Sequence, residues 1–218
     1  MKCQTSKLKG GSVRGMTILD LCSYLGLAAT GAVTINLLLG MLMSLRYSST
    51  RHWPHQQFNL FELHQWTAYA AVALALTHPV VLLFVHTPRF HVFDVVFPVD
   101  SPLQPKVNLA GAAALYLILL VFLSSLLRHR MSRRIWRNLH YLVFPAAVLL
   151  FLHSILTDPN LKNGHPDLLD GGKVFVEICT MLSVLATAVR WRLRGAGLRP
   201  RRTTISGQSR VPVEEPKL

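Results

Sequence analysis

Four histidines lie inside apolar stretches of the chain and form two pairs with nearly equal spacing. His64 and His78 are fourteen residues apart, and His140 and His153 are thirteen residues apart. A histidine within a membrane-spanning helix is costly unless it has a partner, so by default it marks a functional site. Two helices that each carry two histidines about four turns apart can hold two metal centres, one near each face of a bilayer.

The chemistry expected of these histidines is haem ligation at two depths. Two crossings separate the two helices, so they should run in the same direction and each level should receive one imidazole from each helix. Imidazole is a good iron ligand, and two axial imidazoles favour electron transfer over oxygen binding. Zinc would need three or four ligands per site, and no third histidine or acidic residue has the required spacing. We predict that His64 and His140 ligate an inner haem iron, and His78 and His153 an outer one.

The first histidine pair suits a straight helix. Fourteen residues return to within about 40° of the same face and rise about 21 Å. Ala68, Ala71 and Ala75 lie between His64 and His78 on that face. Such a stripe leaves room for a flat, wide group, although small residues also allow close helix contacts.

The second histidine pair does not suit a straight helix. Thirteen residues leave His153 about 140° away from the face of His140. Pro145 lies between them and removes a backbone hydrogen bond, which favours a kink. Ala146 and Ala147 beside it are expected to offer space. We therefore predict a distorted helix that turns both histidines to the same side.

The composition indicates an integral membrane protein. Of the 218 residues, 51% are hydrophobic and only 15% are charged, which a soluble domain of this size would rarely show. Five apolar stretches approach or exceed the ~20 residues that a helix needs to cross the hydrocarbon core. We predict an all-α, multi-pass transmembrane helical bundle of five helices, with six as the alternative. The expected spans are 16–45, 60–85, 107–127, 135–156 and 174–191.

The chain divides into a polar segment over 1–16, a membrane domain over 17–192 and a basic, disordered tail over 193–218. Lysines before the first apolar stretch resemble the start of a signal peptide. The apolar run nevertheless continues to Met43, so we expect a retained first helix. The three cysteines, Cys3, Cys22 and Cys179, have no paired spacing that would indicate a disulfide or a thiolate metal site.

The basic residues predict the orientation. Fifteen Lys or Arg residues fall on one side of the expected bundle and eight on the other. The positive-inside rule places the larger set, with the C-terminus, in the cytoplasm, and we expect a bacterial inner (plasma) membrane. Arg134 and Arg137 precede His140 and are candidates to bind the inner haem's propionates, although the positive-inside rule alone also explains them. Membrane lipid is an expected partner, and no nucleic-acid partner is expected.

These residues resemble a known family, the ferric reductase-like transmembrane domain of ferric reductases, NADPH oxidases and bacterial relatives. That family carries two histidine pairs at this spacing on two helices. The segments 63–66, 77–79 and 136–140 resemble its local motifs. The resemblance covers residues 17–192 and implies two haem b groups that pass electrons from the cytoplasmic to the outer face.

The chain departs from the family in one respect. Ferric reductases and NADPH oxidases continue into a flavin- and nicotinamide-binding module, whereas only about 25 residues follow the last expected helix. No Gly-rich phosphate loop is present. FAD or FMN is therefore expected only on a separate partner. The expected donor is a separate flavoprotein reductase or a quinol, and the acceptor is expected at the outer face. The membrane subunit of the bacterial methionine-sulfoxide reductase is similar in size and plan.

The sequence thus predicts an electron-transfer cytochrome of the ferric reductase-like type, an oxidoreductase subunit with no catalytic residue assigned. A quinol-oxidising cytochrome b subunit of a respiratory complex is one alternative, although its family spaces the histidines differently. A non-redox transporter that uses the histidines for protons is another, although no pair of Gly/Pro-broken helices supports it. The remaining histidines are expected in cytoplasmic loops (His52, His55 and His129) and on the outer side (His86, His91 and His165).

Overall fold

The computed structural model describes residues 17–45, 59–86, 89–102, 104–157 and 170–195. Within these residues the secondary structure is helical, and five helical segments are long and apolar enough to cross a membrane. The prediction of a five-helix, all-α bundle is confirmed. The spanning segments are α1 (Ile18–Ser44), α3 (Leu60–Val81) continued by η1 (Leu82–Phe84), α5 (Pro105–Leu126), α6 (Arg133–His140) with α7 (Val143–Leu156), and α8 (Gly171–Gly195).

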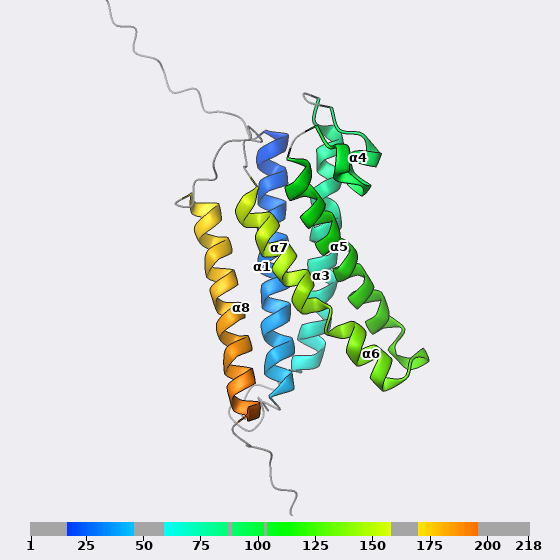
Figure 1. Cartoon of the computed structure of the whole chain (residues 1–218), viewed down its shortest axis with the longest axis vertical. Coiled ribbons are helices and arrows are strands. Elements are labelled where there is room, and N and C mark those ends of the chain that lie inside the picture. Colours follow the sequence, from blue (N-terminus) through cyan, green and yellow to red (C-terminus); the bar gives the residue numbers. More distant parts are fainter. Residues whose placement is uncertain (1–16, 46–58, 87–88, 103, 158–169, 196–218) are drawn as a thin grey trace, which may run out of the picture.

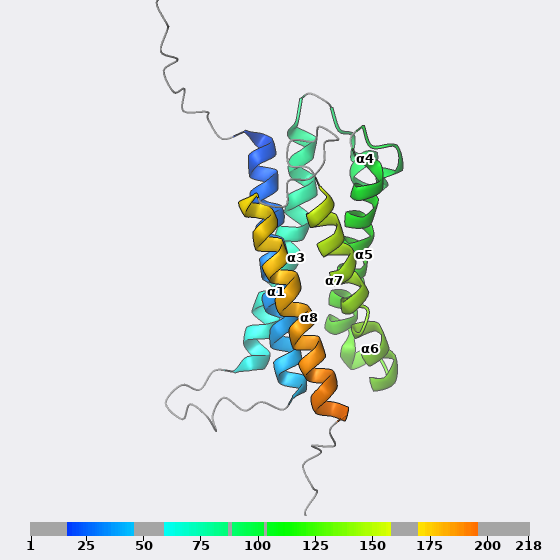
Figure 2. The same cartoon turned by 60° about the vertical axis from the view of Figure 1, so that its left-hand side comes forward.

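The five segments lie side by side with their long axes roughly aligned (Figures 1 and 2). Helix α1 contacts α3, α7 and α8, while α5 contacts α3 and α7. Helices α3 and α7 both run upward in Figure 1, and α1, α5 and α8 run downward. The two histidine-bearing segments are therefore parallel, as the count of crossings predicted.

Local sequence signals explain where the helices begin. Thr17 and Asp20 form a capping box at the start of α1: the Thr17 hydroxyl accepts from the Asp20 N–H at 3.1 Å, and the Asp20 carboxylate accepts from the Thr17 N–H at 2.9 Å. Asn59 caps α3 with its side-chain oxygen, and Pro105 occupies the first position of α5. The capping side chains accept from N–H groups that have no partner within the helix. Proline has no N–H, so at the first position of a helix it leaves none unpaired.

Several buried hydroxyls within the spans bond to their own helices. The hydroxyls of Thr30, Thr34 and Ser183 donate to carbonyls four residues earlier, at 2.8–2.9 Å. A hydroxyl bonded in this way adds no unsatisfied group to the interior of a membrane protein. The burial of these three residues therefore does not require a bound ligand.

The segment that carries His140 and His153 is interrupted between α6 and α7 (Figure 1). Pro145 has no N–H and its ring excludes the Tyr141 carbonyl four residues earlier. The N–H groups of Leu142 and Phe144 instead bond to carbonyls only three residues back, at 3.0 and 3.1 Å. Such bonds wind the chain more tightly than an α-helix does. The predicted distortion is confirmed, and the break lies one turn before Pro145.

The alanines beside Pro145 do not leave open space as expected. Ala146 is fully buried against Val33 of α1 and Ile118 of α5, and Ala147 packs with a second cluster that includes Val176 of α8. Small residues at these positions let α7 approach its neighbours closely. Both alanines therefore belong to the packed core and not to a cavity.

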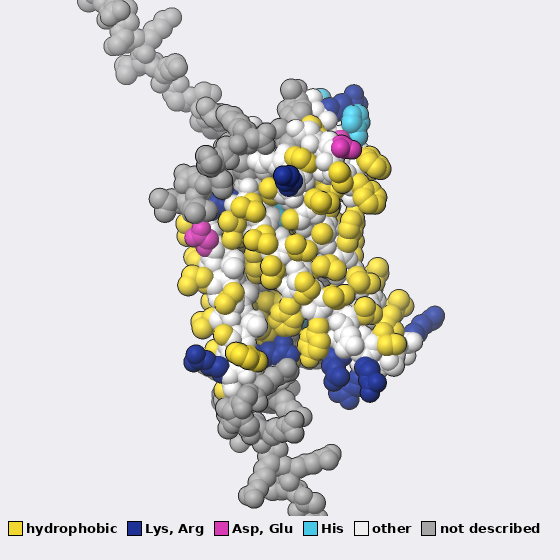
Figure 3. All heavy atoms as spheres, viewed as in Figure 1, with side chains coloured by type: hydrophobic (Ala, Val, Ile, Leu, Met, Phe, Trp, Pro, Cys, Tyr) yellow, Lys and Arg dark blue, Asp and Glu magenta, His cyan; other side chains and the backbone are white. Residues whose placement is uncertain are grey.

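The face of the molecule drawn in Figure 3 has an apolar middle and a basic lower end. Hydrophobic side chains cover the middle of the molecule, and Lys and Arg side chains gather at its lower end (Figure 3). An apolar band of this kind fits contact with lipid. The described basic residues at the lower end are Arg128, Arg130, Arg133, Arg134, Arg137, Arg190 and Arg192.

Several sequence-based predictions fall outside the described residues. They concern the polar segment over 1–16 and nearly all of the basic tail over 193–218. His52, His55, His165 and Cys3 also lie outside the described residues.

Candidate functional site

The structure brings the four predicted histidines together as two facing pairs. We call His64 and His140 the lower pair and His78 and His153 the upper pair, because His64 lies near the start of α3, at its lower end in Figure 1, and His78 lies near its upper end. The ring centres are 6.5 Å apart in the lower pair and 6.4 Å apart in the upper pair. In each pair one ring comes from α3 and the other from α6 or α7. This is the partnership that the direction of the helices predicted.

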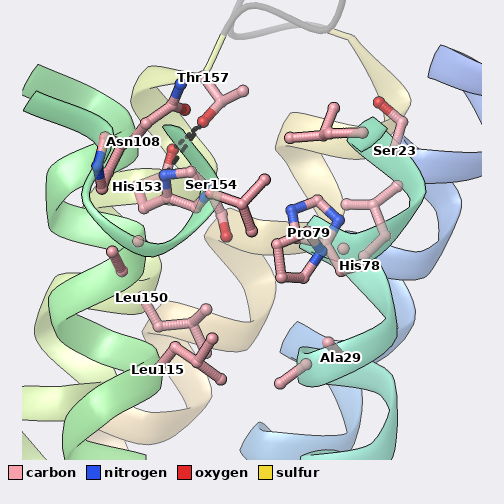
Figure 4. Close-up of a pocket in the computed structure, with 18 of the residues that line it drawn as sticks. Ser23, Ala29, His78, Pro79, Asn108, Leu115, Leu150, His153, Ser154 and Thr157 are labelled. Carbon is pink, nitrogen blue, oxygen red and sulfur yellow. Dashed lines mark hydrogen bonds between the residues drawn. The ribbon is translucent and has the colours of Figure 1, made fainter. Parts of the chain in front are cut away.

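The upper pair lies in a cavity of about 520 Å³. Figure 4 shows His78 and His153 on opposite sides of this cavity, with Leu115 and Leu150 below them. The segment between α3 and α5 contributes further lining residues, among them Phe90. The polar lining residues include Ser23, Asn108, Ser154, Thr157, Asp20, Asp94, Asp170 and Lys173.

The lower pair lies in a second cavity, of about 380 Å³. Of the predicted alanine stripe, Ala68 and Ala71 line this cavity and Ala75 lines the upper one. Ile118 lines both cavities and packs in the apolar cluster with Val33. The two cavities are therefore stacked, with an apolar layer between the two pairs.

Backbone carbonyls of neighbouring helices hold three of the four imidazoles. The Nδ1–H of His64 donates to the Asn36 carbonyl at 3.1 Å, and that of His78 donates to the Cys22 carbonyl at 2.9 Å. The Nδ1–H of His153 donates to the Val107 carbonyl at 2.9 Å. A carbonyl on Nδ1 fixes the tautomer and leaves Nε2 unprotonated, which is the form that binds a metal.

Glycines make this close approach possible. A Cβ placed on Gly26 would lie 3.0 Å from Cε1 of His78, and one on Gly40 would lie 3.3 Å from Cε1 of His64. A Cβ on Gly111 would lie only 2.8 Å from the His153 ring. The absence of a side chain at these three positions lets each imidazole lie directly against the adjacent helix.

The geometry of the two pairs fits a metal ion between the rings. With a metal–nitrogen bond of about 2.0–2.1 Å and a ring centre roughly 1.1 Å behind its nitrogen, two imidazoles on opposite sides of one metal would have centres roughly 6.3 Å apart. Both observed separations are close to this value. Among the described residues, no three His, Cys, Asp or Glu side chains come together as a metal site. A cofactor that brings its own equatorial ligands, as haem does, therefore fits the donor set, and both cavities have the volume of ordinary cofactor sites.

The residues around the lower pair differ in part from those expected. The indole of Trp136 stacks on His140 with ring centres 5.2 Å apart. Arg128 lines the lower cavity, whereas Arg134 and Arg137 are exposed and do not line it. The sequence interpretation did not single out Arg128 as a site residue, although it lies only two residues after the end of α5. A role for Arg134 and Arg137 in binding propionates stays a prediction.

The sequence interpretation also missed the carbonyls and glycines that hold the imidazoles. One signal was present: Gly26 and Gly40 are fourteen residues apart, the same spacing as His64 and His78. The other described histidines do not join the pairs. His86 and His91 are exposed, and His129 is an exposed residue at the edge of the lower cavity.

A comparison with protein families agrees with this geometry. The family model described as "Ferric reductase like transmembrane component" matches residues 25–151, which is more than half of the chain. The matched region contains His64, His78 and His140 and ends two residues before His153. No curated protein and no solved structure is significantly similar to the chain.

Proposed function

The chain belongs to the ferric reductase-like transmembrane family, and from this premise we propose that it is a membrane di-haem b-type cytochrome. The observation that carries the proposal is the presence of two facing imidazole pairs, with ring centres 6.5 and 6.4 Å apart, in two stacked cavities. In this proposal His64 and His140 hold one haem iron, and His78 and His153 hold the other. When bound, the two haems supply one-electron carriers at two depths of the membrane.

The protein's own contribution is to position the ligands and to exclude water. The Nδ1 bonds to backbone carbonyls set the orientation of three rings before any cofactor binds. His64 and His78 are separated by about 21 Å along α3. Ile118 and the apolar cluster around it fill the space between the cavities. This apolar layer excludes water between the two levels, and a dry interior favours electron transfer between them.

The proposed direction follows from the basic lower end. We place this end in the cytoplasm because the described Arg residues gather there (Figure 3), in accord with the positive-inside rule. The lower pair would then receive electrons from a separate flavoprotein reductase or a quinol. The upper pair would deliver them to an acceptor at the outer face. The same orientation puts the C-terminus in the cytoplasm.

The test is to count haem in the purified chain. The reduced-minus-oxidised spectrum of protein expressed with ample haem should show b-type absorption, and the pigment should amount to about two haems per polypeptide. The variants His64→Ala and His78→Ala should each retain about one haem, because each removes a ligand of a different level. His91→Ala, an exposed histidine outside both pairs, is the matched control and should retain two. Wild-type protein without b-type absorption would overturn the proposal in favour of a non-redox role.

A further inference from the structure

Helix α1 holds the two histidines of α3 by a repeated arrangement. The carbonyl of Cys22 accepts from His78, and Gly26 follows four residues later. The carbonyl of Asn36 accepts from His64, and Gly40 again follows four residues later. In each repeat a glycine lies one turn beyond the accepting carbonyl and makes room for the ring.

The repeat has a further common feature, since the residue that offers the carbonyl also donates from its side chain. The Asn36 amide donates to the His64 carbonyl at 2.6 Å, and the Cys22 thiol donates to the His78 carbonyl at 3.5 Å. Each histidine of α3 is therefore bonded to α1 through both its ring and its backbone. The two levels of α3 are equivalent in this respect.

Helix α5 repeats the arrangement once and then departs from it. The Val107 carbonyl accepts from His153, and Gly111 follows four residues later. Fourteen residues further along, Val121 and Ser125 occupy the corresponding positions opposite His140. The fourth position thus carries a serine where the other three carry a glycine.

The serine changes the hydrogen bonding of His140. The Ser125 hydroxyl donates to the Val121 carbonyl at 2.8 Å, and its oxygen lies 3.4 Å from Nδ1 of His140. The neighbouring Ser124 hydroxyl donates to the same carbonyl at 2.8 Å. The Val121 carbonyl corresponds to the carbonyls that hold the other three imidazoles, but here it accepts from two hydroxyls. The His140 Nδ1–H faces a hydroxyl oxygen.

We propose that Ser125, inserted between the His140 imidazole and the Val121 carbonyl, is a positioning residue that sets the redox potential of the haem in the lower pair alone. This inference rests on the proposed di-haem function. The Ser125 oxygen lies 3.4 Å from Nδ1 of His140, whereas the carbonyls lie 2.9–3.1 Å from Nδ1 of the other three histidines. At the longer distance the serine is the weaker acceptor. A weaker acceptor leaves the imidazole less basic, and a less basic axial ligand stabilises the oxidised iron less. Ser125 thus keeps the lower haem easier to reduce than a glycine would.

The test uses single-haem proteins so that each level is measured separately. His78→Ala retains the lower haem and His64→Ala retains the upper one. Ser125→Gly in the lower-haem protein frees the Val121 carbonyl for His140, so the midpoint potential should shift to a more negative value. Ser125→Ala keeps the Cβ but removes the hydroxyl, so it should shift the potential to a more positive value and weaken haem binding about 10-fold. Redox titration of the b-type absorption measures both shifts.

Two controls separate this role from a structural one. Ser124→Ala removes a bond to the same carbonyl without touching His140, so it should leave the potential unchanged. Ser125→Gly in the upper-haem protein should also cause no shift. Equal shifts at both levels, shifts of the same sign for Gly and Ala, or no shift in the lower-haem protein would overturn the inference and leave the proposed function standing. Absence of haem from the wild-type protein would instead overturn the proposed function, and this inference with it.

Discussion

The upper and lower pairs present their imidazoles at nearly the same separation but hold them by different means. Both rings of the upper pair donate from Nδ1 to backbone carbonyls of adjacent helices, whereas in the lower pair only His64 does so. A backbone carbonyl remains when the side chain of its residue is replaced, so its position depends on how the helices pack. The serine partner of His140 is a side chain and can vary. The upper level is therefore held by backbone carbonyls at both rings, and the lower level at one ring only.

The helices that carry His140 and His153 also end differently. Below, His140 ends α6 immediately before the break that Pro145 imposes. Above, the buried ammonium of Lys173 on α8 donates to the carbonyls of Ser154, Ile155 and Thr157 at the end of α7. A cation at a helix C-terminus satisfies carbonyls that have no partner within the helix. His153 is therefore held in a helix with a fixed end.

The largest expected effect is at Gly111, which tests whether the upper level tolerates change. Gly111→Val would place its Cβ 2.8 Å from the His153 ring, so the ring must move and the upper haem should be lost. The haem count should fall from about two to about one per polypeptide. Gly171→Val makes the same substitution where nothing lies within 4 Å, and it should retain both haems. Full retention in Gly111→Val would show that the upper level is not rigid.

A smaller effect is expected at Lys173. Lys173→Met should leave the carbonyls at the end of α7 without their charged donor. The free energy of unfolding should therefore fall by about 1–3 kcal/mol. Because Lys173 lines the upper cavity, loss of its charge should also shift the midpoint potential of the upper haem to a more negative value. Thermal unfolding in detergent and redox titration measure the two effects. Lys106→Met removes an exposed charge from the same end and should change neither the stability nor the potential. A shift confined to the lower haem in Lys173→Met would contradict the placement of Lys173 beside the upper pair.

The smallest effect is expected at Pro145, which tests the distortion of the lower level. Pro145→Ala restores an N–H that can bond to the Tyr141 carbonyl and so favours a continuous helix. This change should rotate His140 away from His64 and weaken binding of the lower haem about 10-fold, or ~1.4 kcal/mol. Haem titration of the His78→Ala protein measures it. Pro105→Ala, at the first position of α5 where proline fits without strain, is the control, and equal losses in both variants would argue against a specific role for the break.

The sequence predicted correctly the features that depend on residues close together in the chain. The lengths of apolar runs predicted five spans, and the observed segments begin and end within a few residues of the expected ones. The spacing of His64 and His78 predicted a shared face, and Pro145 predicted the interruption. The interpretation of Ala146 and Ala147 was wrong because small residues can mean either open space or close packing. Only the position of neighbouring helices distinguishes these two outcomes.

The sequence by itself determined the class of the protein, the number of spans and which histidines could meet, because these follow from hydropathy and from the fixed rise and turn of a helix. Only the tertiary structure decided which groups hold those histidines. The carbonyls of α1 and α5 have no signature in the sequence, since every residue carries one. The glycines, Ser125 and Lys173 gain their roles from the register at which distant helices pack. That register depends on the fit of many side chains at once, so it appears only when the helices are assembled.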